Sequence, residues 1–188
     1  MTFGNLAALR ARTPGDVIRF KVGDATIHRV VEMECGFTPI LEFFPTLTKE
    51  RLEENRSWMQ PAALDADDNL VLCFQSYVLQ IGGKNILVDS CVGNDKSREA
   101  RPLWNKKKDW AFQNGLAAAG LTFNDIDFVM CSHLHGDHFG GLPFFLLDAQ
   151  LVSRRTQPLV IAGPPGLTER LNIIREAMFA GSTSIEPK

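Results

Sequence analysis

The segment of residues 131–138, with the sequence CSHLHGDH, limits what this chain can fold into more than any other feature. Three of the chain's four histidines and one aspartate lie within six consecutive residues of it. The segment directly follows an apolar run, FVM at 128–130, which favours a buried β-strand. The fold must therefore end a strand at a point where imidazole and carboxylate groups are concentrated.

The concentrated groups are His133, His135, Asp137 and His138. Imidazole nitrogen and carboxylate oxygen are ligands that suit Zn²⁺, and also Mn²⁺ or Fe²⁺. On an extended segment His133 and His135 point the same way, because side chains alternate with a period of two. Gly136 allows a sharp turn without a Cβ penalty. We therefore predict two neighbouring pairs of ligands, His133 with His135 and Asp137 with His138.

The pattern His-x-His-x-Asp-His, placed after an apolar strand, resembles the signature of the metallo-β-lactamase superfamily. The resemblance implies an α/β fold, the αββα sandwich of that superfamily. Residues 1–188 would form a single domain that is incomplete on its C-terminal side, with the N-terminal half and one further βα unit. The resemblance also implies one or two zinc ions, or Mn or Fe instead, held by His133, His135, Asp137 and His138.

A further acid, Asp89, ends the apolar run ILV at 86–88. In the superfamily an aspartate at the end of the matching strand orients the metal-bound imidazoles, as such ligands require. The resemblance therefore assigns to Asp89 the role of orienting the metal-bound imidazoles. The alternative is an ordinary aspartate that caps a turn at the end of a strand.

The resemblance implies a hydrolase in which metal-bound hydroxide attacks an ester, a lactone or a related bond, with Asp137 as the catalytic group that handles the water proton. Residues 90–96 resemble the lactonase-like members. The part after His138 resembles the ribonuclease Z and phosphodiesterase branch, so a nuclease is the alternative. Members usually add a later histidine and a bridging aspartate, and no histidine follows His138. A catalytically inactive fragment is therefore a third interpretation, and whether the chain is an enzyme stays open.

Composition narrows the choice of partners and location. A net charge of −2 gives no electrostatic support for a nucleic-acid partner or a membrane surface. We expect a small-molecule substrate and leave a homodimer open, because an exposed sheet face would favour association. The four cysteines lie far apart and read as reduced thiols, which favours the cytoplasm.

The chain on either side of the motif alternates between strand-like and helix-like patterns. The expected strands are 16–22, 25–34, 70–81, 85–89 and 158–162, and the expected helices are 48–59, 109–119 and one starting at 167. Residues 35–64 read as an insertion that is rich in aromatic side chains. It either packs over the sheet edge or forms a lid over the mouth of the active site.

Overall fold

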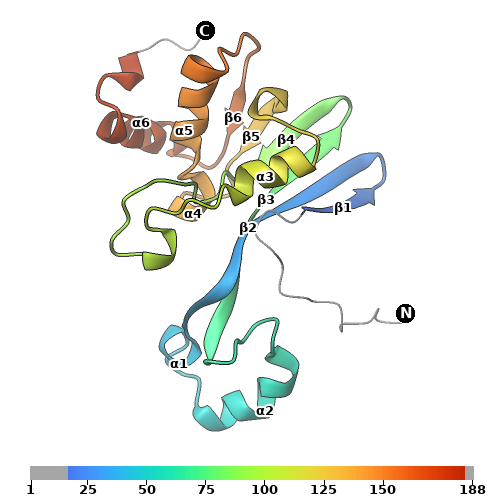
Figure 1. The fold of residues 1–188 in the computed structure, drawn as a ribbon, viewed down its shortest axis with the longest axis vertical. Helices are drawn as coiled ribbons and strands as arrows, with labels where there is room; N and C mark the ends of the chain where they lie inside the picture. The colour runs from blue at the N-terminus through green and yellow to red at the C-terminus, as the bar shows by residue number, and fades with distance from the viewer. Residues whose placement is uncertain (1–16, 185–188) are drawn as a thin grey trace.

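The computed structural model describes residues 17–184, and its six strands form one sheet in the order β1-β2-β3-β4-β5-β6 (Figure 1). Neighbouring strands run antiparallel from β1 to β4, whereas β4, β5 and β6 run parallel. The strands are β1 (Val17–Val22), β2 (Ala25–Pro39), β3 (Asn69–Ile81), β4 (Lys84–Val88), β5 (Phe128–Met130) and β6 (Val160–Ala162). The expected α/β class is confirmed.

Helices cover one face of this sheet. The α-helices of the described residues are α1 (Ile40–Phe43), α2 (Lys49–Met59), α3 (Ala111–Ala118), α4 (Gly136–Phe139), α5 (Leu142–Leu147) and α6 (Leu167–Met178). Helices α3, α5 and α6 lie against the strands (Figure 1), where Phe112, Phe145 and Leu171 join the main core. Within residues 17–184, no helix is long and apolar enough to cross a membrane.

The strand register gives the sheet two apolar faces with different surroundings. On the helix side Val78, Leu87 and Val129 are aligned across three strands and are at most 1% exposed. The opposite face carries an aligned apolar row whose members are only partly buried or exposed: Phe20, Ile27, Leu79, Ile86, Phe128 and Val160. Parallel strands are normally covered on both faces. The described residues thus leave one apolar face of the sheet accessible to water.

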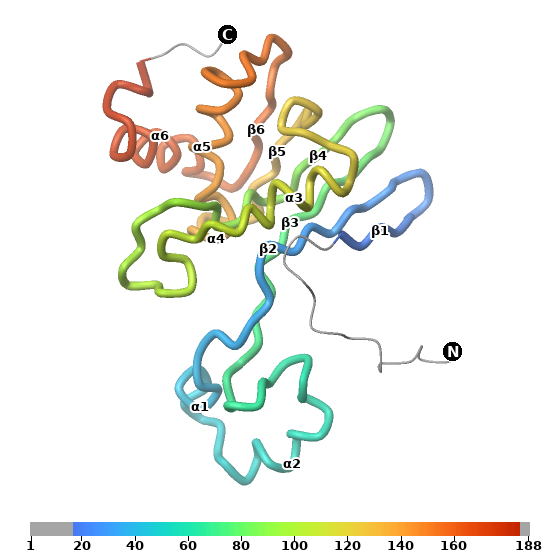
Figure 2. Tube along the Cα trace, in the orientation of Figure 1, coloured from blue at the N-terminus to red at the C-terminus, as the bar shows by residue number. Residues whose placement is uncertain are grey.

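A long hairpin of β2 and β3 extends from the body and carries α1 and α2 at its tip (Figures 1 and 2). We call residues 36–69 the arm. The arm has a small core of its own, in which Ile40, Leu52 and Leu64 are at most 3% exposed. Helix α2 begins where the sequence predicts it, because the Thr48 side chain accepts a hydrogen bond from the backbone N–H of Arg51.

The expected end of the second strand is wrong. We expected it at Glu34, followed by an insertion from Cys35, but β2 continues to Pro39 and stays paired with β3. Two register irregularities, between Val31 and Met33 and between Gly36 and Thr38, break the regular alternation of side chains. Because alternation of side chains is the sequence signal for a strand, the predicted end of the strand comes too early.

We predict that Leu87→Ala destabilises the protein more than Ile86→Ala, its neighbour on the opposite face of β4. Leu87 is fully buried, so its truncation should cost about 2–5 kcal/mol, whereas the partly exposed Ile86 should cost about 1 kcal/mol. Urea unfolding of both variants measures the difference. Equal losses would contradict the solvent-accessible face, because they would mean that Ile86 is also covered in solution.

Candidate metal centre

Asp89 joins the end of β4 to the histidine-rich segment. Strands β4 and β5 are parallel, with Val88 paired to Met130, so the residues that follow both strands meet at one edge of the sheet. The buried Asp89 carboxylate accepts hydrogen bonds from the backbone N–H and from the hydroxyl of Ser132, each at 2.8 Å. It also lies 2.8 Å from Nδ1 of His138.

The backbone of Asp89 is itself unusual. Its φ of 61° lies in the left-handed region, which residues with a Cβ seldom adopt. Its N–H donates to the carbonyl of Met130 at 2.8 Å, so the turn out of β4 is fixed against β5. Such conformations persist where the surroundings over-determine them, and they concentrate at functional sites.

His138 is held with one ring nitrogen committed and the other available. A carboxylate only accepts, so Nδ1 of His138 carries the hydrogen that is donated to Asp89. The other nitrogen, Nε2, lies 3.4 Å from Oδ2 of Asp137. Two ligands of one tetrahedral zinc at about 2.0–2.1 Å are about 3.3 Å apart. The Asp137–His138 pair therefore has the separation of two ligands of one cation.

His133 is oriented in a similar way by Ser132. The Ser132 hydroxyl donates its one hydrogen to Asp89, so it accepts from Nδ1 of His133, 3.0 Å away. The His133 ring centroid lies 3.7 Å from that of His138 and 4.8 Å from that of His135. His133 is thus closer to His138 than to its predicted partner His135, because the one-turn helix α4 folds His138 back over the segment.

Cys131 is the remaining candidate donor in this segment. Burial and the nearby Asp89 carboxylate raise the pKa of its thiol to about 11, so the thiol is protonated at neutral pH. Its Sγ donates to the carbonyl oxygen of His133 at 3.0 Å. This hydrogen bond joins the Cys131 side chain to the backbone two residues later, so Cys131 supports the turn.

The structure gathers all four predicted ligands in one cluster, but as close pairs. Within residues 17–184, no group of three or more His, Cys, Asp or Glu side chains is arranged so that it could hold a metal ion. The chemistry of the donors fits a divalent cation, as do the Asp137–His138 separation and the orientation of His138 by Asp89. His135, the most exposed of the four, is not part of such a group.

A cleft of about 510 Å³ lies between the arm and residues 100–104. Its apolar lining comes mainly from Phe37, Phe43, Leu103 and Trp104. The Trp104 ring makes an edge contact with buried Phe74, with centroids 5.4 Å apart, so this wall is anchored in the sheet. The sequence pattern suggested a lid from the aromatic residues of 35–64, but it gave no signal for Trp104.

Arg98 connects this cleft with the histidine-rich segment. Its Cζ lies 5.9 Å from the Trp104 ring, and both terminal nitrogens are 3.1 Å from the carbonyl oxygen of Val92. Burial lowers the pKa of Arg98, while the carboxylates of Glu32 and Asp137 act in the opposite direction. The guanidinium therefore lies within the electrostatic reach of Asp137 on one side and next to the cleft on the other.

Comparisons with known proteins give curated relatives for part of the chain. Ribonuclease Z of Agathobacter rectalis is 34% identical over 97 residues, which are 52% of this chain and 26% of the relative. Ribonuclease Z of Oceanobacillus iheyensis is 35% identical over 80 residues, which are 43% of this chain and 26% of the relative. The chain thus spans about a quarter of the length of these two relatives.

Solved structures share the fold at low sequence identity. The hydrolase AbOPH matches with a TM-score of 0.53 and 19% identity, over 69% of this chain and 40% of the other. A probable metal-dependent hydrolase from Staphylococcus aureus matches with a TM-score of 0.50 and 23% identity, over 65% of this chain and 42% of the other. AidC, described as a dizinc quorum-quenching lactonase, matches with a TM-score of 0.52 and 19% identity, over 66% of this chain and 38% of the other.

The family comparison covers the candidate metal centre itself. The family model described as the metallo-beta-lactamase superfamily matches residues 75–173, more than half of the chain. That range contains Asp89 and the whole of residues 131–138. The chain therefore belongs to the metallo-β-lactamase superfamily, whose members are generally metal-dependent hydrolases.

Proposed function

We propose that this chain is a zinc-dependent hydrolase of small esters or lactones, with its metal held by His133, His135, Asp137 and His138. The single observation that carries the proposal is the pair of contacts made by the His138 ring. Its Nδ1 binds Asp89, and its Nε2 faces Asp137. A carboxylate that fixes the far nitrogen of a ligating imidazole is the usual arrangement at metal sites.

The chain's own groups then have distinct roles. Asp89 keeps the hydrogen of His138 on Nδ1, so that the lone pair of Nε2 faces Asp137. Ser132 does the same for His133. When bound, a divalent cation polarises the scissile bond and lowers the pKa of water towards about 7. The Asp137 carboxylate would accept the proton of the attacking water.

The cleft between the arm and residues 100–104 supports a small organic substrate. Its aromatic lining suits an acyl or aryl substituent. The net charge of −2 offers little attraction for a polyanion.

Two other functions compete with this one. The curated relatives are named ribonuclease Z, which favours a phosphodiesterase or nuclease. Within residues 17–184 no three donor side chains are arranged to hold a metal ion, which favours the interpretation of a catalytically inactive fragment. Both make predictions that differ from those of an ester or lactone hydrolase, and substrate assays separate the three.

Asp89→Asn should weaken zinc binding by about 10–100-fold, because the amide lacks the charge that orients His138. Titration of the metal-free protein with Zn²⁺ measures this. Asp127→Asn is the matched control: this carboxylate also accepts a backbone N–H and pairs with a side chain, Lys84, but it precedes β5. Equal weakening in both variants would contradict the assigned role of Asp89.

With Zn²⁺ or Mn²⁺ added, we expect turnover of p-nitrophenyl esters and lactones and none of bis-p-nitrophenyl phosphate. Trp104→Ala should raise KM by about tenfold, since apolar contacts of this kind contribute about 1–3 kcal/mol. Trp58→Ala, which removes a 69% exposed tryptophan outside the cleft, should leave KM unchanged. Activity on the phosphodiester alone would favour the nuclease, and no turnover of any substrate would favour the inactive fragment.

A further inference from the structure

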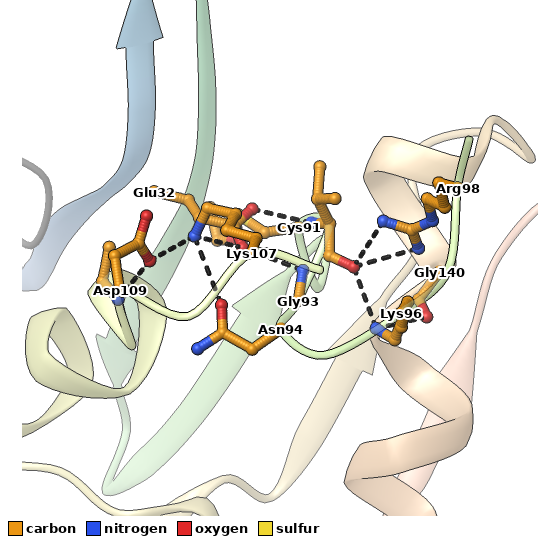
Figure 3. A network of polar contacts seen from close by, with 12 residues as sticks. Glu32, Cys91, Gly93, Asn94, Lys96, Arg98, Lys107, Asp109 and Gly140 are labelled. Atoms are coloured by element: carbon orange, nitrogen blue, oxygen red, sulfur yellow. Dashed lines mark hydrogen bonds and ion pairs between the residues drawn. The ribbon is translucent and has the colours of Figure 1, made fainter. Parts of the chain in front are cut away.

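A buried lysine holds the end of the short helix that carries two of the proposed ligands. Lys96 is only 7% exposed, and its Nζ donates to the carbonyl oxygens of Val92 at 2.9 Å and of Gly140 at 3.2 Å (Figure 3). Gly140 is the residue directly after α4. Nζ also lies 4.0 Å from the centre of the Phe144 ring in α5. The Lys96 ammonium group thus joins the loop after β4 to the end of α4 and to α5.

The burial of the Lys96 amine costs free energy that a purely structural contact would not require. Burial, first of all, and the neighbouring Arg98 lower its pKa to about 8, so the amine is still mostly charged at neutral pH. Burying a charge without a close counter-ion is unfavourable. Glu32, whose carboxylate raises the pKa of Lys96, is committed to other donors, so the hydrogen bonds of Lys96 go to backbone oxygens and its ammonium group lies over the Phe144 ring.

The groups that bind the Glu32 carboxylate form the other half of this network. Glu32 is 1% exposed and accepts from the backbone N–H groups of Val92 at 2.7 Å and Gly93 at 2.8 Å. Its Oε1 also lies 3.4 Å from Nζ of Lys107, which is 8% exposed and pairs with Asp109 (Figure 3). Lys107 therefore fixes the same loop from the opposite side, but its hydrogen bonds and ion pairs do not reach α4.

The loop after β4 also packs directly against α4. The N–H and the hydroxyl of Ser90 both donate to the carbonyl of His138, at 2.7 and 3.1 Å. A Cβ on Gly141 would collide with the carbonyl oxygen of Ser90, so only glycine allows the two backbones to approach so closely. Two hydrogen bonds from Ser90 to the His138 carbonyl and one from Lys96 to the Gly140 carbonyl therefore hold the C-terminal end of α4.

We propose that Lys96 is a positioning residue for the Asp137–His138 pair. By holding Gly140, Lys96 fixes the C-terminal end of α4, and with it the 3.4 Å separation between Asp137 and His138. The inference rests on the proposed function, because it concerns the metal ligands proposed there. Lys96 itself touches neither the substrate cleft nor the ligand atoms.

The test compares Lys96→Met with Lys107→Met, two buried lysines of one network that differ in their contact with α4. Zn²⁺ titration of the metal-free chain should show at least a tenfold loss of affinity for Lys96→Met and less than a twofold loss for Lys107→Met. Urea unfolding of both variants records the loss of stability. Nitrogen NMR of the metal-free protein should show the His138 ring leaving its single Nδ1–H form only in Lys96→Met.

The outcomes separate the inference from the proposed function. Unchanged zinc affinity in Lys96→Met, or an equal loss in both variants, would overturn the positioning role and leave the metal site standing. Failure of the unsubstituted chain to bind zinc would refute the proposed function, and the His138 ring signals would then decide the role of Lys96 alone. Partial recovery of affinity in Lys96→Arg, which keeps a cation at this position, would support that role further.

Discussion

The contact between Asp89 and residues 132–138 is the interaction on which the site depends. It exists because β4 and β5 are parallel neighbours, so the residues that follow them emerge at the same edge of the sheet. One carboxylate accepts from the Ser132 backbone, the Ser132 hydroxyl and the His138 ring. Without it the His138 ring would be free to turn, and the His133 ring would lose the serine that orients it.

The surroundings of this contact are rigid on one side and open on the other. The helix side of the sheet has a buried core, and the loop after Asp89 is fixed by two buried lysines and a buried glutamate. The opposite side of the sheet presents an apolar row from β1 to β6 that is accessible to water. The candidate centre thus lies at the edge of a sheet that is well packed on its helix side. The exposed His135 is the least constrained member of the centre.

The sequence predicted the parts of this arrangement that depend on local patterns. The two hairpins, the helix capped by Thr48 and the strand before the histidines follow from alternation, turn residues and capping, which are local. The concentration of His133 to His138 marked the centre for the same reason. What the sequence did not predict depends on distant contacts: Glu32 meets Gly93 across 61 positions, and Lys96 meets Gly140 across 44.

One contact within the motif lay beyond what local patterns predict. Alternation predicted that His133 would pair with His135, but the turn of α4 brings His138 closer to His133. The effect of a helical turn on residues before it depends on what holds that turn. Here Asp89, Ser90 and Lys96 hold it, and all three come from a strand end and a loop more than 40 positions earlier in the chain.

Anomalous diffraction at the zinc edge, from crystals grown with Zn²⁺, would locate the bound cation. We expect a zinc peak about 2.0–2.2 Å from both Nε2 of His138 and a carboxylate oxygen of Asp137, with Asp89 still bonded to Nδ1. A structure without a peak at this pair, or with the His138 ring turned away from Asp89, would contradict it.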